Sequence, residues 1–201
     1  MFSTYQQIVY TVIIYLCLFL SFFYRNRNGI DLFIYFTVVC TIETLPIILG
    51  KEWSGRIYSV ASLMYIGFFT YYYGKFMRNQ KKLIYVLGLI SGLICFYFML
   101  GSSKNFAVGL GVTLALFYIF LSLSWLFNEV RNVDEDFIAK KQVFWVSSAI
   151  LLWSVFFLFR IVPMYWLEKN DLAFLIMLDK IFRIAVTVTY IIFIIAITCK
   201  K

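Results

Sequence analysis

The sequence predicts an all-α, polytopic transmembrane bundle of seven helices, with the N-terminus outside and the C-terminus in the cytoplasm. The chain is 63% hydrophobic and only 14% charged, whereas soluble domains are about 45–50% apolar and about 25% charged. Its apolar residues form long runs between short charged connectors. These runs are apolar all round and longer than the alternating strands of a membrane barrel, so we expect helices that satisfy their own backbone in lipid.

Seven apolar runs mark the predicted spans of one transmembrane domain over residues 1–201. Each run is close to the roughly 20 residues that cross a bilayer as a helix. The spans are about 7–24, 32–50, 57–74, 83–102, 106–127, 142–165 and 172–199. The first run lacks a basic n-region and ends in "FFYRNRN", so we expect a retained span and not a cleaved signal peptide.

The basic residues of the connectors predict the orientation, because cytoplasmic loops carry an excess of Lys and Arg. Eleven fall on the side that includes the C-terminus, against four on the other side. The eleven are Arg25, Arg27, Lys75, Arg78, Lys81, Lys82, Arg131, Lys140, Lys141, Lys200 and Lys201, and the four are Lys51, Arg56, Lys104 and Lys169. An odd number of spans places the termini on opposite sides, in agreement with this asymmetry.

The second run contains an acid, Glu43, eight residues before Lys51 and thus about 12 Å deep. Because an ionised acid there costs on the order of 2.5–3.5 kcal/mol, we expect Glu43 to face the bundle interior, either protonated or beside a cation. The alternative is a protonated acid that only hydrogen-bonds a neighbouring helix. Pro46, three residues later, is a predicted helix hinge because it can kink the helix and free a carbonyl.

The third and fourth runs carry helix-packing and pocket signals. Tyr58, Ser62 and Tyr65 are polar at helical spacing near the outer end of the third run and are predicted to line a pocket. Gly88 and Gly92 have the GxxxG spacing that lets two helices approach closely. This face would support either packing within the chain or a homo-oligomer.

The longest predicted connector, residues 128–142, mixes acidic and basic residues on the cytoplasmic side. One interpretation is a solvated extension of a helix. The other is a docking surface for a cytoplasmic partner protein.

The sixth run ends near Arg160, which precedes Pro163 by three residues, as Glu43 precedes Pro46. These are the only two prolines of the chain, and Pro163 is the second predicted hinge. Both runs cross from inside to outside, so Glu43 and Arg160 are expected at similar depth, where a charge-assisted pair would satisfy both. Arg160 also follows 18 uncharged residues, so the alternative is that it snorkels to the outer interface.

The last run places Asp179 and Arg183 four residues apart, the favourable order for a pair on one helix face. Thr187 continues this stripe as a predicted pocket residue. The alternative is an interfacial turn that holds Asp179, Lys180 and Arg183, an interpretation that suits Lys180 best. The polar groups of the chain therefore gather in the predicted outer half, which favours a cavity open to the outside or to the outer leaflet.

No catalytic, metal or cofactor motif stands out. The chain has no histidine, the commonest general base and metal ligand, and its four cysteines are scattered singly and predicted to pack as small hydrophobes. We expect no metal and no cofactor. The net charge of +8 lies mainly in connectors, so membrane orientation explains it better than nucleic acid. A non-enzymatic role is favoured over an intramembrane lipid-acting hydrolase, for which Glu43 and Asp179 would be the paired carboxylates.

The seven runs can be divided into three, one linker run and three more, and each half has a proline in its middle run. This layout resembles the small transporters of the SWEET and PQ-loop class. The resemblance is topological, covers the whole chain and implies a parallel repeat with hinged helices. The Pro-Gln dipeptide of that class is absent, and no substrate-binding residue is carried over.

The sequence thus favours a multi-pass protein of a bacterial inner membrane, whose Ile/Phe/Tyr/Lys/Asn-rich composition is typical of AT-rich genomes. An outward polar site at Glu43, Arg160, Asp179 and Arg183 would bind or sense a small ligand or lipid and signal to a partner protein. The alternatives are a SWEET-like solute transporter, an oligomeric pore-type effector and the lipid hydrolase.

Overall fold

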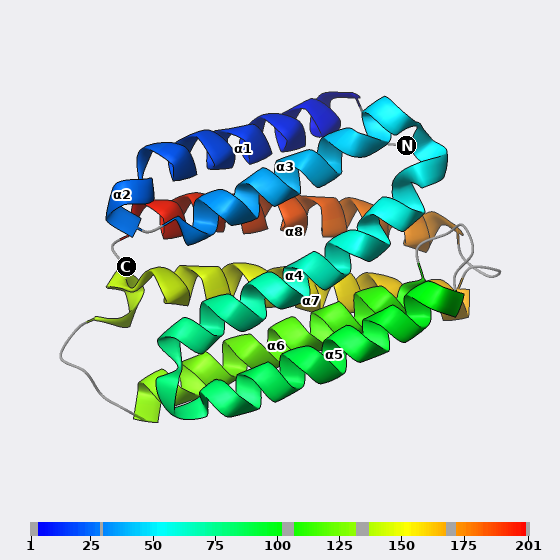
Figure 1. The fold of residues 1–201 in the computed structure, drawn as a ribbon. Helices are drawn as coiled ribbons and strands as arrows, with labels where there is room; N and C mark the ends of the chain where they lie inside the picture. The colour runs from blue at the N-terminus through cyan, green and yellow to red at the C-terminus, as the bar shows by residue number, and fades with distance from the viewer. Residues whose placement is uncertain (1–3, 29, 102–106, 132–136, 168–171, 200–201) are drawn as a thin grey trace. The chain divides into compact units, whose positions relative to one another are not determined.

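A computed structural model describes residues 4–28, 30–101, 107–131, 137–167 and 172–199, and Figure 1 shows its ribbon. Within these ranges all regular structure is helical. The seven long helices are α1 (Thr4–Phe23), α3 (Asp31–Leu49), α4 (Ser54–Phe76), α5 (Lys81–Gly101), α6 (Val108–Arg131), α7 (Gln142–Leu167) and α8 (Leu172–Thr198). Between them lie α2 (Arg25–Asn28) and the 3-10 turns η1 (Lys51–Trp53), η2 (Arg78–Gln80) and η3 (Ile138–Lys140). The prediction of an all-α chain with seven long helices is confirmed for these residues.

Five of the described helices are long and apolar enough to cross a membrane. They are Asp31–Leu49, Arg78–Gly101, Val108–Arg131, Gln142–Ile161 and Ala173–Thr198. The first predicted run contributes a shorter apolar helix, Ile8–Phe23. Helix α4 is not among the five, because the serines, the threonine and the tyrosines between Arg56 and Lys75 lower its hydropathy. Five such helices indicate a multi-pass membrane protein.

Helix α3 ends where glycine allows the chain to leave the helical path. Gly50 has a φ of 96°, a left-handed conformation that residues with a Cβ adopt at a cost. Its N–H donates to the Pro46 carbonyl at 3.1 Å, which satisfies one of the carbonyls at the helix end. The sequence thus places a proline in the last turn of α3 and a glycine directly after the helix.

The chain divides into two compact units, residues 1–40 with 134–201 (unit 1) and residues 41–133 (unit 2). Helix α3 supplies residues 31–40 to unit 1 and its remainder to unit 2. The single domain expected over residues 1–201 stays a prediction.

Unit 1 is built around the α7–α8 pair, which makes the most extensive helix contact in the described chain. Helix α1 also packs on α8, where the Cys17 thiol donates to the Tyr190 carbonyl at 3.5 Å. The first half of α3 adds Phe36, whose ring lies 5.5 Å from that of Phe193 in an edge-on contact. Both phenylalanines are almost fully buried, so aromatic packing holds these helices together.

Unit 2 is formed by α4, α5 and α6, which all contact one another (Figure 1). Phe69 of α4 meets Tyr118 of α6 with ring centroids 4.9 Å apart. Gly88 of α5 lies against Thr70 of α4 so closely that an added Cβ would approach the Thr70 Cγ2 to 2.7 Å. Close approach of α4 and α5 therefore depends on the absence of a side chain at position 88.

Candidate functional site

The charged residues predicted on α7 and α8 meet at one place in unit 1. The Arg160 Nη2 lies 3.0 Å from the Asp179 Oδ1. The Arg183 Nε donates to the Asp179 Oδ2 at 2.6 Å, and the Arg183 Nη2 forms an ion pair with the same oxygen. One carboxylate is thus shared by two guanidinium groups, which we call the Arg–Asp–Arg cluster (Arg160, Asp179 and Arg183).

The antiparallel pairing of α7 and α8 positions this cluster. Gln142 at the start of α7 donates from its Nε2 to the Ala196 carbonyl near the end of α8, at 3.3 Å. The two helices run in opposite directions, as the contacts Gln142–Ala196 and Arg160–Asp179 show. Arg160 therefore lies opposite Asp179. Arg183 then follows Asp179 by one helical turn on the same face, because residues four apart are neighbours on a helix.

An aromatic group supports Arg160. Its guanidinium carbon lies 5.0 Å from the centroid of the Phe182 ring, a distance at which a cation is attracted to the ring face. Phe182 contacts Phe157 and Trp153 of α7, with centroids 6.0 and 6.4 Å away, and those two rings stack at 4.8 Å. Sequence reasoning missed this group, although positions 153, 157 and 160 have the spacing of one helix face.

The cluster lies about 10 Å inside the helix ends. Arg160 precedes the end of α7 by seven residues and Asp179 follows the start of α8 by seven, at about 1.5 Å per residue. The flanking residues, "IVPMYWL" (161–167) and "LAFLIML" (172–178), are all uncharged. The polar residues 168–171 separate these two flanks, and an interfacial turn that holds Asp179, Lys180 and Arg183 stays a prediction. Lys180 is exposed and does not belong to the cluster.

The cluster carries a surplus of positive charge. Two guanidinium groups face one carboxylate, which leaves a net charge of +1. The side chains are 36%, 28% and 21% exposed for Arg160, Asp179 and Arg183, so Arg160 is the most accessible of the three. An additional anion would therefore be attracted first to Arg160.

Glu43 lies in unit 2, where it faces α4. The Tyr58 hydroxyl donates to the Glu43 Oε2 at 3.3 Å, and both side chains are half-buried. The acid and the tyrosine predicted to line a pocket are thus together. A Glu43–Arg160 pair would join the two units and stays a prediction.

The other residues named from the sequence fall on helix surfaces and contacts. Ser62 is buried and donates to the Tyr58 carbonyl at 2.9 Å, and Thr187 is half-buried and donates to the Arg183 carbonyl at 3.0 Å. Tyr65 is half-buried on α4. Gly92, unlike Gly88, has nothing within 4 Å of an added Cβ.

Some predictions concern residues outside the described part of the chain. The middle of the 128–142 connector, residues 132–136, falls there, as do Lys104, Lys169, Lys200 and Lys201. Pro46 lies inside α3, whereas the side chain of Pro163 lies outside the described part.

The described residues contain no group of three or more His, Cys, Asp or Glu side chains that would hold a metal ion. Cys17, Cys40 and Cys95 are buried free thiols and Cys199 is a half-buried one. No known protein family, curated protein or solved structure matches this chain. The geometry of its own residues is therefore what supports a function.

Proposed function

We propose that this chain is a seven-helix protein of a bacterial inner membrane that binds a small anionic ligand, or the anionic group of a lipid, at the Arg–Asp–Arg cluster. Binding would be sensed and passed to a partner protein. The observation that carries the proposal is a carboxylate shared by two arginines on facing helices. One arginine would be enough to neutralise Asp179.

The second cation is what favours a ligand. A charge in an apolar environment is retained at a cost, which falls when an opposite charge is close. With Arg183 beside Asp179, Arg160 is the surplus cation. The Arg160 side chain is partly exposed and its guanidinium lies over the Phe182 ring. It is therefore placed to bind a carboxylate or phosphate group by charge-assisted hydrogen bonds.

The predicted orientation would put the cluster in the outer half of the membrane. With the N-terminus outside, α7 leads outward, and Arg160 lies about 18 residues beyond its start, or roughly 27 Å at 1.5 Å per residue. The asymmetry of eleven basic residues against four supports this orientation. The ligand would then arrive from outside or from the outer leaflet.

The α7–α8 pair would carry the signal to the cytoplasmic side. It connects the Arg–Asp–Arg cluster at one end with the Gln142–Ala196 hydrogen bond at the other. That second end adjoins the 128–142 connector, the predicted docking segment. A ligand that draws Arg160 away from Asp179 would alter the packing of this helix pair, whose α7 begins at Gln142, the last residue of the connector.

Binding is tested with the full chain in neutral detergent, by titrating acetate or inorganic phosphate at constant ionic strength and following thermal unfolding. We expect both anions to raise the unfolding temperature of the wild type, and Arg160→Gln to abolish the rise. Lys180→Gln removes the same charge outside the cluster and should leave the rise unchanged. Equal responses of the wild type and Arg160→Gln would refute the proposal.

Transport by a SWEET-like mechanism is the second candidate, favoured by Pro46 inside α3 and by the repeated proline spacing of the two halves. Vesicles that contain the protein distinguish the two functions through solute flux. Solute flux through the wild type that is lost in Glu43→Gln would favour transport and refute the sensor interpretation. Anion-dependent stabilisation without flux would favour sensing.

A further inference from the structure

One end of unit 2 collects basic side chains from consecutive elements. Lys75 lies in the last turn of α4, Arg78 in η2, and Lys81 and Lys82 in the first turn of α5, while Arg131 ends α6. All five are exposed. We call them the basic end.

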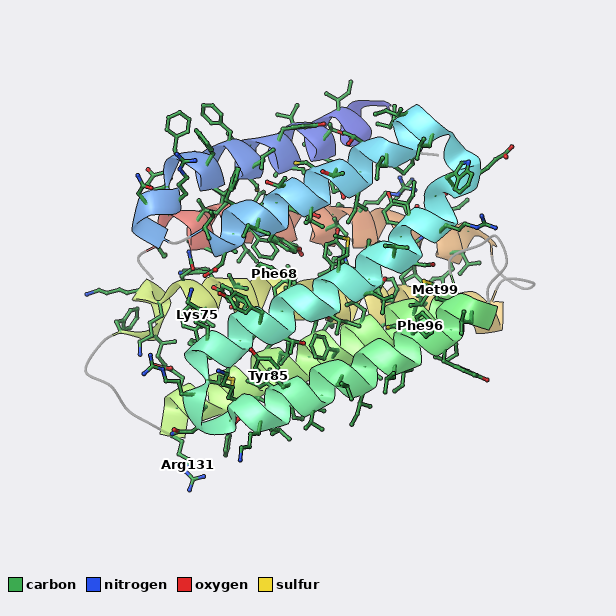
Figure 2. The ribbon with its side chains drawn as sticks, viewed as in Figure 1. Phe68, Lys75, Tyr85, Phe96, Met99 and Arg131 are labelled. Atoms are coloured by element: carbon green, nitrogen blue, oxygen red, sulfur yellow. The ribbon has the colours of Figure 1, made fainter. Side chains whose placement is uncertain are left out.

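The pairing of the three helices explains why these residues share one end. Helices α4 and α5 are antiparallel neighbours, as the contacts of Gly88 with Thr70 and of Gly74 with Tyr85 show. Helix α6 returns antiparallel to α5, with the Cys95 thiol near the Leu110 carbonyl. The end of α4, the start of α5 and the end of α6 therefore coincide, and Figure 2 shows Arg131 pointing away from the helices there.

The charge of this end is almost entirely positive. Glu129 is the only acidic residue between Ser54 and Arg131. Five basic residues against one acid leave a local surplus of +4. The basic end shares no residue with the Arg–Asp–Arg cluster, which belongs to unit 1.

The surface next to the basic end is apolar, which decides between the classes of anionic partner. Exposed Leu83, Val86 and Leu89 follow Lys82 along α5, at 48%, 54% and 65% exposure. The Lys81 Nζ also lies 5.8 Å from the ring centroid of Tyr85, itself exposed. A cation and a tyrosine directly above an apolar face are typical of the boundary between headgroups and acyl chains. A nucleic acid or a soluble acidic protein would leave that apolar face uncovered.

We propose that the basic end binds the phosphate groups of acidic phospholipids, with Arg78, Lys81 and Lys82 as its centre. The lysines and the arginine bind the phosphates electrostatically, and the exposed apolar face of α5 contacts the acyl chains. Clusters of several basic residues at the end of a span attract acidic lipids in this way. Each removed charge should lower the affinity roughly fivefold.

The test uses the full chain in nanodiscs or mixed micelles in which phosphatidylglycerol replaces phosphatidylcholine stepwise. Native mass spectrometry counts the lipids that stay bound. We expect the wild type to retain phosphatidylglycerol in preference to phosphatidylcholine, and Lys81→Gln/Lys82→Gln to lose that preference by about 25-fold, or fivefold per charge. Lys81→Arg/Lys82→Arg keeps the charges and should restore it.

The matched control is Lys140→Gln/Lys141→Gln, which removes an adjacent lysine pair from unit 1. We expect it to stay within about twofold of the wild type, because neither lysine is part of the basic end and Lys141 is half-buried. An equal loss in both double variants would overturn the proposal in favour of a general effect of net charge. So would a wild type without lipid preference.

Free glycerol phosphate separates a lipid site from a site for the soluble headgroup. We expect no competition at concentrations where phosphatidylglycerol is retained, since the apolar face of α5 adds nothing to the soluble ion. Displacement of the lipid by glycerol phosphate alone would overturn the lipid assignment. Retention of an oligonucleotide that depends on Lys81 and Lys82 would overturn it as well.

Discussion

Replacing Asp179 with asparagine tests the Arg–Asp–Arg cluster most directly. The carboxylate contacts Arg160 at 3.0 Å and Arg183 at 2.6 Å. Asparagine has nearly the same shape but no charge. The two guanidinium groups would then face each other without their shared counter-ion, while the packing of α7 on α8 stays almost the same.

The expected cost follows from the number and kind of these contacts. A hydrogen bond to a charged group contributes about 1.5–3 kcal/mol, and the partial exposure of all three side chains favours the lower end of that range. Two such contacts place the loss for Asp179→Asn at about 2–4 kcal/mol of unfolding free energy. Arg160→Gln removes the surplus cation and leaves the Asp179–Arg183 pair neutral, so we expect its cost to be about 1 kcal/mol or less.

The assay is equilibrium unfolding in mixed micelles of dodecyl maltoside and increasing dodecyl sulfate, followed by circular dichroism. Glu52→Gln neutralises an exposed acid of unit 2 and serves as the control. In the double variant, removing Arg160 should recover about 1–2 kcal/mol of the loss caused by Asp179→Asn. A cost for Asp179→Asn below about 0.5 kcal/mol, or strict additivity of the two changes, would refute a shared carboxylate.

Three further outcomes are expected. Gly88→Ala should lower the unfolding free energy by about 1–3 kcal/mol, because its Cβ would overlap a threonine of α4. Gly92→Ala has open space and should be neutral or stabilising by up to about 1 kcal/mol. The same unfolding assay compares the two variants, and equal costs would contradict the close approach at position 88. Glu43→Gln keeps an oxygen that accepts the Tyr58 hydroxyl, so its stability should match the wild type more closely than that of Glu43→Leu; a stability of Glu43→Leu equal to that of Glu43→Gln would argue against this hydrogen bond. A hydrophilic maleimide should label Cys199 in the native protein and the three buried cysteines only after denaturation. Mass spectrometry of the peptides shows which cysteines are labelled. Labelling of a buried cysteine in the native protein would contradict its burial.

The sequence by itself determined the helices, because uninterrupted apolar runs of about 20 residues leave the backbone few alternatives. It also pointed to Asp179 beside Arg183, since spacing along one helix is local information. Which residue of another helix reaches the carboxylate depends on how α7 packs on α8. The 18 uncharged residues before Arg160 were compatible with snorkelling, and only the tertiary structure brought Arg160 to Asp179 and Phe182.

The two glycines of the GxxxG pattern show the same limit. Spacing cannot distinguish Gly88 from Gly92, because both lie on one face of α5. Only the position of α4 decided that Thr70 packs on Gly88 while Gly92 has nothing within 4 Å of its place for a side chain. Hydrophobicity and spacing are properties of the chain alone, whereas a contact is a property of two helices, so the sequence determined the elements and tertiary packing decided their partners.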